Sequence, residues 1–243
     1  MAGHSKWANI KRKKSKVDAQ RGKLFTRLSK EIIVAARNGG PDPDNNMRLK
    51  AAIQKAKEAN LPNENINRAI QKGAGEVEGA AYEEIVYEGY GPGGVAVLLE
   101  IMTDNRNRTA GEIRHIFSRY GGSLGETGCV AWMFDQKGLF IVEKSDNNIN
   151  EDDLMIIALE AGVEDFKTED DSYEITTAPA DFYKVKEVLE DKGLRLAMAE
   201  ITMVPQTTIN LSGNDADMMV KLLETLEDHD DVQNVYTNFE LNE

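Results

Sequence analysis

Few side chains in this 243-residue chain have the types and spacing that catalysis or metal binding requires. The three histidines, His4, His115 and His229, lie far apart, and none belongs to an HxxxH or HExxH pair of the kind that binds zinc on a helix. Cys129 is the only cysteine, so it cannot form an internal disulfide, and we expect it to be a buried thiol in a strand. Because no nucleophile–base pair or metal-ligand cluster emerges, we predict that the protein is not an enzyme and holds no cofactor or metal.

Two further segments resemble ligand sites, but each has a simpler interpretation. The glycine-rich GYGPGG (89–94) precedes a predicted strand, so it presents no helix N-terminus to a phosphate, and we interpret it as a turn. The acidic EDHDD (227–231) could hold a divalent ion weakly. Its place between a predicted helix and a predicted strand is more typical of a solvated turn.

Positive charge is concentrated at the N-terminal end of the chain. Residues 1–72 contain 17 lysines and arginines against 6 acidic residues, whereas residues 73–243 contain 12 against 36, and the net charge is −13. Residues 1–16, here called the basic arm, contain six cations and no acidic residue: Lys6, Lys11, Arg12, Lys13, Lys14 and Lys16. Such a segment attracts phosphates without reading a base sequence. Trp7 within the arm could stack on an unpaired base or pack against the helices.

The first predicted helix separates apolar and cationic side chains. At about 100° per residue, an apolar face gathers that includes Leu24, Phe25, Leu28 and Ile32. The opposite face carries four cations, here called the basic ridge: Lys23, Arg27, Lys30 and Arg37. We predict that the basic arm and the basic ridge together bind the phosphate backbone of a nucleic acid, although charged residues also cover ordinary solvated faces.

A second group of cations lies in the acidic part of the chain. Arg108, His115 and Arg119 share one face of a predicted helix, at spacings of seven and four residues. We therefore predict a second phosphate contact through Arg108 and Arg119. The local alternative is that Asp104 or Asn105 caps this helix and that the polar residues only close the turn before it.

Apolar periodicity places these residues on predicted elements. The basic head has three helices, at about 18–38, 44–60 and 63–73, followed by a glycine-rich linker. Strands are then expected at 84–90, 95–103 and 129–134, with a helix at 107–120. Residues 138–204 have the order βαββαβ, which is typical of a ferredoxin-like sandwich. The C-terminal part adds a strand, a helix and a strand at 207–212, 216–227 and 232–240.

This order suggests that one domain is inserted in another. Without residues 138–204, the two flanking strand–helix–strand segments form a second βαββαβ unit. We therefore predict an α+β multidomain protein with three parts: a basic helical domain at 1–76, a discontinuous ferredoxin-like domain at 77–136 plus 205–243, and an inserted ferredoxin-like domain at 137–204. The strand at 84–90 would extend the outer sheet. Two side-by-side domains divided near residue 136 remain the alternative, because patterns identify elements better than topology.

Six stretches of the sequence resemble the YebC family, which includes the mitochondrial translational activator of cytochrome c oxidase. These stretches are GHSKWANIKRKK (3–14), AARNGGPDP (35–43), RAIQKGAG (68–75), YEGYGPGGVAV (87–97), TDNRNRT (103–109) and GGSLGETGCVAWMF (121–134). The resemblance is nearly full-length, and it implies a cytoplasmic, non-enzymatic protein with a helical N-terminal domain and two α/β domains. It also implies a probable transcriptional regulator that binds DNA, although the family is linked to translation at the ribosome as well.

We therefore predict a nucleic-acid-binding regulator of gene expression, with transcriptional regulation through DNA as the leading hypothesis. A translation factor that binds ribosomal RNA is the alternative, because both partners are polyanions. The acidic body would limit nonspecific binding or meet a protein partner. No apolar run is long enough for a membrane span or a secretory signal, so we expect a cytoplasmic protein without a membrane partner.

Overall fold

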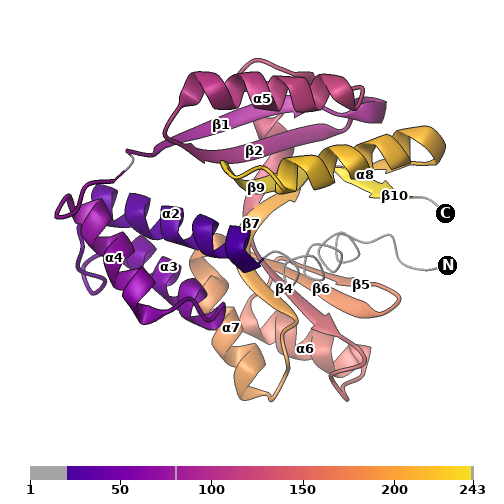
Figure 1. The fold of residues 1–243 in the computed structure, drawn as a ribbon. Coiled ribbons are helices and arrows are strands. Elements are labelled where there is room, and N and C mark those ends of the chain that lie inside the picture. The colour runs from indigo at the N-terminus through magenta and orange to yellow at the C-terminus, as the bar shows by residue number, and fades with distance from the viewer. Residues whose placement is uncertain (1–20, 80, 242–243) are drawn as a thin grey trace.

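The computed structural model of the protein describes residues 21–79 and 81–241, whose elements form three lobes (Figure 1). The N-terminal lobe, here called the head, consists of helices α2 (Arg21–Gly39), α3 (Met47–Glu58) and α4 (Asn63–Ala74). Their apolar faces enclose a core around Ile32, Leu49 and Ile66. The helical character predicted for the N-terminal region is therefore confirmed.

Short-range contacts explain why the head helices begin and pack where they do. Asn46 caps α3, because its side-chain oxygen accepts the backbone N–H of Leu49 at 3.1 Å. Its amide group also donates to the carbonyl oxygen of Ala35 at 2.8 Å, which fixes α3 against α2. Gly73 allows α4 to approach α2 closely, since a Cβ atom there would lie 2.5 Å from the carbonyl oxygen of Ile33.

The lower lobe in Figure 1 has the ferredoxin-like order that the sequence predicts. It consists of β4 (Phe134–Glu143), α6 (Glu151–Ala161), β5 (Asp165–Thr168), β6 (Ser172–Thr177), α7 (Phe182–Asp191) and β7 (Met198–Pro205). The strands form an antiparallel sheet in the order β5-β6-β4-β7. Helices α6 and α7 cover one face of this inserted sheet, with Phe140, Leu154 and Val185 in the core between them.

The upper lobe contains the outer sheet, whose strands come from both sides of the inserted segment. It consists of β1 (Glu83–Tyr90), β2 (Ala96–Thr103), α5 (Arg106–Arg119), β3 (Ser123–Leu124), α8 (Gly213–Glu227) and β9 (Val232–Thr237). The strand order is β3-β1-β2-β9, and every pair is antiparallel. Helices α5 and α8 cover one face, where Leu99, Phe117 and Leu222 are buried. The boundaries proposed for independent folding units remain a prediction.

Two strands of the outer unit differ from the sequence prediction. Residues 129–134 form no strand of their own: they contain the short 3₁₀ helix η3 (Ala131–Met133), and β4 begins directly at Phe134. Residues 207–212 supply only β8 (Ile209–Leu211), which pairs in parallel with β10 (Phe239–Leu241) outside the outer sheet. The strand predicted at 84–90 is β1, and it lies inside the outer sheet between β3 and β2, where its hairpin with β2 lets two adjacent segments pair at low entropic cost.

A buried carboxylate fixes the loop that connects the outer sheet to the inserted sheet. Glu88 on β1 accepts backbone N–H groups of Gly128, Val130 and Ala131 at 2.6, 2.7 and 2.7 Å. Burial alone would raise the pKa of Glu88, but these three hydrogen bonds lower it below its usual value. Cys129 in the same loop is half-buried, and burial raises the pKa of its thiol. Ahead of β2, the short 3₁₀ helix η2 (Pro92–Gly94), with Gly93 and Gly94 at positive φ, forms the turn that was predicted for residues 89–94.

The three lobes surround a central cleft of about 860 Å³. Its lining includes Leu28 and Arg48 from the head, Val86 and Glu100 from the outer sheet, and Glu174 and Glu200 from the inserted sheet. The residues from both sheets belong to the faces that no helix covers, because the alternate residues of the same strands pack under the helices. Within residues 21–79 and 81–241, no helix has the length and apolar character needed to cross a bilayer.

Candidate nucleic-acid interface

The predicted site residues fall into three groups that differ in how they are placed. The six cations of the basic arm lie outside the described residues: Lys6, Lys11, Arg12, Lys13, Lys14 and Lys16. The basic ridge of α2 and the cations of α5 are both described. Their surroundings show which of these positive charges are available to a phosphate.

Two residues of the basic ridge contact the C-terminal end of α8, although the Lys23 side chain stays 41% exposed. Lys23 Nζ donates to the carbonyl oxygen of Asp228 at 2.7 Å, and Arg27 donates to the carbonyl oxygen of Glu227. Carbonyl groups at a helix C-terminus lack helical partners and carry the negative end of the helix dipole, so cations stabilise them. Burial lowers the pKa of Arg27, while the acidic residues around it oppose that shift. The ridge therefore attaches the head to the outer unit.

Lys30 makes the most buried of these contacts. Its Nζ lies 2.8 Å from Oδ1 of Asp231, and both side chains are only 7% exposed. The same ammonium group donates to the carbonyl oxygens of Asp230 at 2.9 Å and of Met102 at 3.2 Å. The sequence pattern grouped Lys30 with the phosphate-binding cations of the ridge, but the structure buries it against Asp231, which lies 201 positions away in the sequence. A phosphate can reach this Nζ only after the head has left the outer sheet.

Asp231 is the centre of a network that joins the head, α5 and β2. Besides Lys30, its carboxylate accepts from Arg108 at 2.7 Å, Thr109 at 2.8 Å and Thr103 at 3.2 Å. Burial alone would raise the pKa of Asp231, but the hydrogen bonds from Lys30, Arg108 and Thr109 outweigh burial and hold it well below its usual value. Asp231 is thus an ionised, fully bonded carboxylate.

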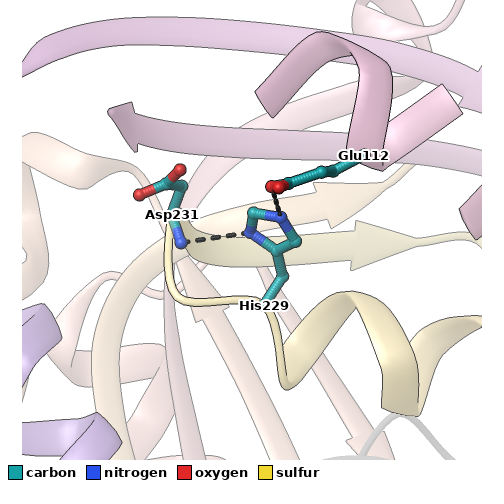
Figure 2. Close-up of side chains that lie close together, drawn as sticks. All are labelled: Glu112, His229 and Asp231. Carbon is teal, nitrogen blue, oxygen red and sulfur yellow. Dashed lines mark hydrogen bonds and ion pairs between the residues drawn. The ribbon is translucent and has the colours of Figure 1, made fainter. Parts of the chain in front are cut away.

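Glu112, His229 and Asp231 lie close together, as a metal site would require, but their ligand atoms are engaged (Figure 2). His229 Nδ1 accepts the backbone N–H of Asp231 at 3.1 Å, so the ring proton is on Nε2, which donates to Glu112 at 2.9 Å. Figure 2 shows the Asp231 carboxylate turned away from the ring, toward its own donors. We therefore assign no metal to this cluster. The turn at 227–231 instead supplies the carbonyl oxygens and the carboxylate that bind the cations of the basic ridge.

A second ion-pair group joins the head to the edge of β1. Arg48 on α3 bonds Glu31 of α2 through Nε at 2.8 Å and Glu84 of β1 through Nη2 at 2.5 Å. The hydrogen bonds to Glu84 and Glu31 raise the pKa of Arg48 above its usual value. Because the three side chains are partly exposed, this group contributes less to stability than the Lys30–Asp231 pair.

The remaining predicted cations lie at the surface. Arg37 is exposed and reaches the carbonyl oxygen of Tyr82 at 3.4 Å. Arg119 is exposed, and its guanidinium lies 5.5 Å from the ring centroid of Tyr120. Arg108 instead bridges Asp104 at 3.1 Å and Asp231 at 2.7 Å, so its charge is already neutralised. Of the two predicted phosphate contacts on α5, Arg119 is accessible and Arg108 is used inside the molecule.

Helix α5 presents a larger cationic surface than the sequence spacing indicated. Asn105 caps the helix, since its side-chain oxygen accepts the N–H of Arg108 at 3.1 Å, as the local alternative predicted. Ile113 and Phe117 point into the core, while four basic side chains of the helix are exposed: Arg106 at its first residue, and Arg114, His115 and Arg119 further along. We call these four residues the α5 face. Arg106 and Arg114 were missed because their helical angles lie close to those of Ile113 and Phe117, where the pattern predicts burial.

The head also exposes cations outside the basic ridge. In the described part of the head these include Arg21 on α2, Lys50, Lys55 and Lys57 on α3, and Arg68 on α4. Lys50 lies 3.9 Å from Asp44, at a separation that contributes little at a solvated surface. The predicted site rested on the basic arm and on the faces of the helices at 18–38 and 107–120, so these residues of the head were not selected.

The fold and the surface together define the class of protein: an α+β protein with a cationic helical head and two α/β units. The model of the TACO1/YebC N-terminal domain matches residues 5–76, and the model of the TACO1/YebC second and third domains matches residues 82–239. This chain therefore belongs to the TACO1/YebC family, and the resemblance seen in the sequence is confirmed.

Relatives and a solved structure match over nearly the whole chain. A probable transcriptional regulatory protein of Pelotomaculum thermopropionicum is 70% identical, and one of Desulforamulus reducens is 66% identical, each covering 99% of both chains. The crystal structure of the conserved hypothetical protein Aq1575 from Aquifex aeolicus is similar with a TM-score of 0.81 and 50% identity, over 94% of each chain. The α+β fold is thus shared with a structure solved by experiment.

Proposed function

We propose that the protein is a non-enzymatic, cytoplasmic regulator of gene expression that binds nucleic acid, with duplex DNA as its target. We infer transcription as the regulated process from the relatives, since those at 70% and 66% identity are named probable transcriptional regulatory proteins. The mode of contact comes from this chain's own surface. Cations of the basic arm add to the affinity, as the sequence analysis predicts.

The α5 face is the single observation that carries this proposal. Four of the 12 lysines and arginines in residues 73–243 lie on this 14-residue helix. Arg106, Arg114 and Arg119 are exposed, and among the described residues no ion pair joins them to a carboxylate. In a region with 36 acidic residues, unneutralised arginines on one helix are best explained by an external anion.

The geometry of α5 suits contacts with several phosphates of a duplex. At about 1.5 Å per residue, the 13 steps from Arg106 to Arg119 span roughly 20 Å. This is about the length of six base pairs at roughly 3.4 Å per step. Arginine donates several hydrogen bonds from a planar group, which matches phosphate oxygens better than lysine does. Contacts of this kind set affinity and position without reading bases.

Crosslinking in cells, followed by sequencing of the attached nucleic acid, tests the proposal. We expect promoter DNA to be enriched with the wild-type protein and to be strongly reduced with R106Q/R114Q/R119Q. The matched control is K184Q/K192Q/R195Q, which removes three exposed cations from the inserted unit and changes the net charge equally. Enrichment of large-subunit ribosomal RNA would overturn the DNA target in favour of the translation alternative. Enrichment of neither, or an equal loss in both variants, would contradict nucleic-acid binding by the α5 face.

A further inference from the structure

The central cleft is acidic, although the head that forms one of its walls is basic. Its lining contains eight glutamates and four lysines or arginines. Two of those four cations are already occupied, because Arg27 binds the end of α8 and Arg48 binds Glu31 and Glu84. Arg48 in turn pairs two of the eight glutamates, so six glutamates, against Lys55 and Lys167, leave the described lining of the cleft net negative, which disfavours a nucleic acid there.

One carboxylate in the cleft is buried without a partner. Glu174 on β6 is only 6% exposed, and no hydrogen bond or ion pair to it is formed by the described residues. Its cross-strand neighbours are Ile141 on β4 and Lys167 on β5, but Lys167 Nζ is directed to Asp165 at 3.9 Å. The carboxylate oxygens of Glu174 are not among the fully enclosed, unbonded atoms of the described residues, so a cationic ligand in the cleft can reach them, and such a ligand would stabilise this largely buried charge.

Two further carboxylates, Glu169 and Glu240, lie near Glu174, and the negative charges of Glu174 and Glu240 affect the ionisation of Glu169. Burial raises the pKa of Glu169, and the charges of Glu174 and Glu240 raise it further. Glu169 follows β5 and Glu240 lies on β10. We call Glu169, Glu174 and Glu240 the cleft carboxylates; they come from the inserted sheet and from the C-terminal strand. Bringing a positive charge among them relieves both the repulsion and the cost of burial.

We propose that the central cleft binds a lysine- and arginine-rich polypeptide segment, with the cleft carboxylates as the anchor for its cations. A metal ion is a poorer match, because no three carboxylates of the cleft, among the residues described, bring oxygen atoms within 4.8 Å of one another. Apolar side chains lie between the charges, including Leu139, Met198 and Val86. This mixture suits the aliphatic stems and charged ends of lysine and arginine. The inference is independent of the proposed nucleic-acid contact.

Binding of a synthetic peptide to the full chain tests this inference. The probe is a peptide of about 12 residues that alternates lysine, arginine and leucine, followed by fluorescence anisotropy. We expect E169Q/E174Q/E240Q to weaken binding roughly tenfold or more, because a buried carboxylate discriminates more than an exposed one. The matched control is E78Q/E160Q/E187Q, which removes three exposed carboxylates and should change binding by less than about twofold.

Three results of the binding experiment would overturn the proposal, and a crosslinking experiment adds a fourth. The first is absence of binding by the wild type at low salt, and the second is an equal loss in both variants, which would indicate net charge alone. The third is tight binding of spermidine with the same dependence on Glu174, which would assign the cleft to small polycations. Carbodiimide crosslinking should join peptide lysines to Glu169, Glu174 or Glu240, whereas crosslinks confined to other carboxylates would also contradict the assignment.

Discussion

Helices α2 and α5 both carry a row of cations, but the two rows have different surroundings. Lys23, Arg27 and Lys30 on α2 meet carbonyl oxygens and a carboxylate at the end of α8. Arg114 and Arg119 on α5 point outward and meet no carboxylate among the described residues. A row of positive charge on an amphipathic helix therefore predicts an anionic partner without saying whether that partner is another molecule or a distant part of the same chain.

Among variants that remove a contact of the α2 cations, the loss of Asp231 should have the largest effect on stability. Asp231→Asn leaves Lys30 buried without its counter-charge, and we expect the free energy of unfolding to fall by roughly 3–5 kcal/mol. Urea unfolding followed by circular dichroism measures this change. Asp230→Asn is the control, because Lys30 binds the carbonyl oxygen of Asp230 and not its side chain. Equal losses in the two variants would show that the buried pair does not hold the head.

The same pair should make stability depend on pH in acid. The pKa of folded Asp231 lies below its ordinary value of 3.8, so the ionised carboxylate contributes fully above that pH. As the pH falls below 3.8 toward the folded pKa, the contribution is lost. The difference in unfolding free energy between wild type and D231N should therefore be largest near neutral pH and shrink in acid. A difference that stays constant from neutral to strongly acidic pH would contradict this account.

Arg48 offers a smaller test of how the head is attached. Arg48→Gln removes the link between Glu31 and Glu84, both of which are partly exposed. We expect a loss of about 1 kcal/mol or less, since solvated ion pairs contribute little. Thermal unfolding at low and high salt checks this, because the difference in thermal stability between the wild type and R48Q should shrink as salt is added. A loss as large as that of D231N would mean that the partly exposed group, not the buried pair, holds the head.

The fold was predicted best where pairing is local in sequence. The inserted unit has the expected order because each of its elements has a clear period and a turn on either side, and β4 to β7 complete one sheet by themselves. The outer unit was harder to predict, since β9 pairs with β2 from the far side of the insertion and residues 207–212 supply only β8, which pairs with β10 outside the outer sheet. The helices and the long strands were easier to predict than the short strands β3 and β10 and the pairing of the strands.

The sequence predicted which types of residue form the candidate site, but it predicted less well which of their side chains are free to contact a phosphate. The helical pattern of α2 correctly separates Lys30 from the apolar side, but nothing near Lys30 in the sequence indicates Asp231. The contact of Arg108 was equally hard to predict, since this residue shares a helix face with Arg119 but its side chain binds Asp231. Arg114 lies about 100° from Ile113 and about 60° from Phe117 on the helix, so the pattern alone does not place it away from the core, and the structure is needed to show that it is exposed.

Binding of duplex DNA as a function of salt, compared between two variants, tests the central claim most directly. R106Q/R114Q/R119Q should retain wild-type stability but flatten the dependence of log affinity on log salt by about two to three units, at roughly 0.9 per phosphate contact. K23Q/R27Q should keep the wild-type slope and lose stability, because its cations bind α8. The reverse pattern, with binding lost in K23Q/R27Q and unchanged in the α5 variant, would show that the ridge and not the α5 face meets the nucleic acid.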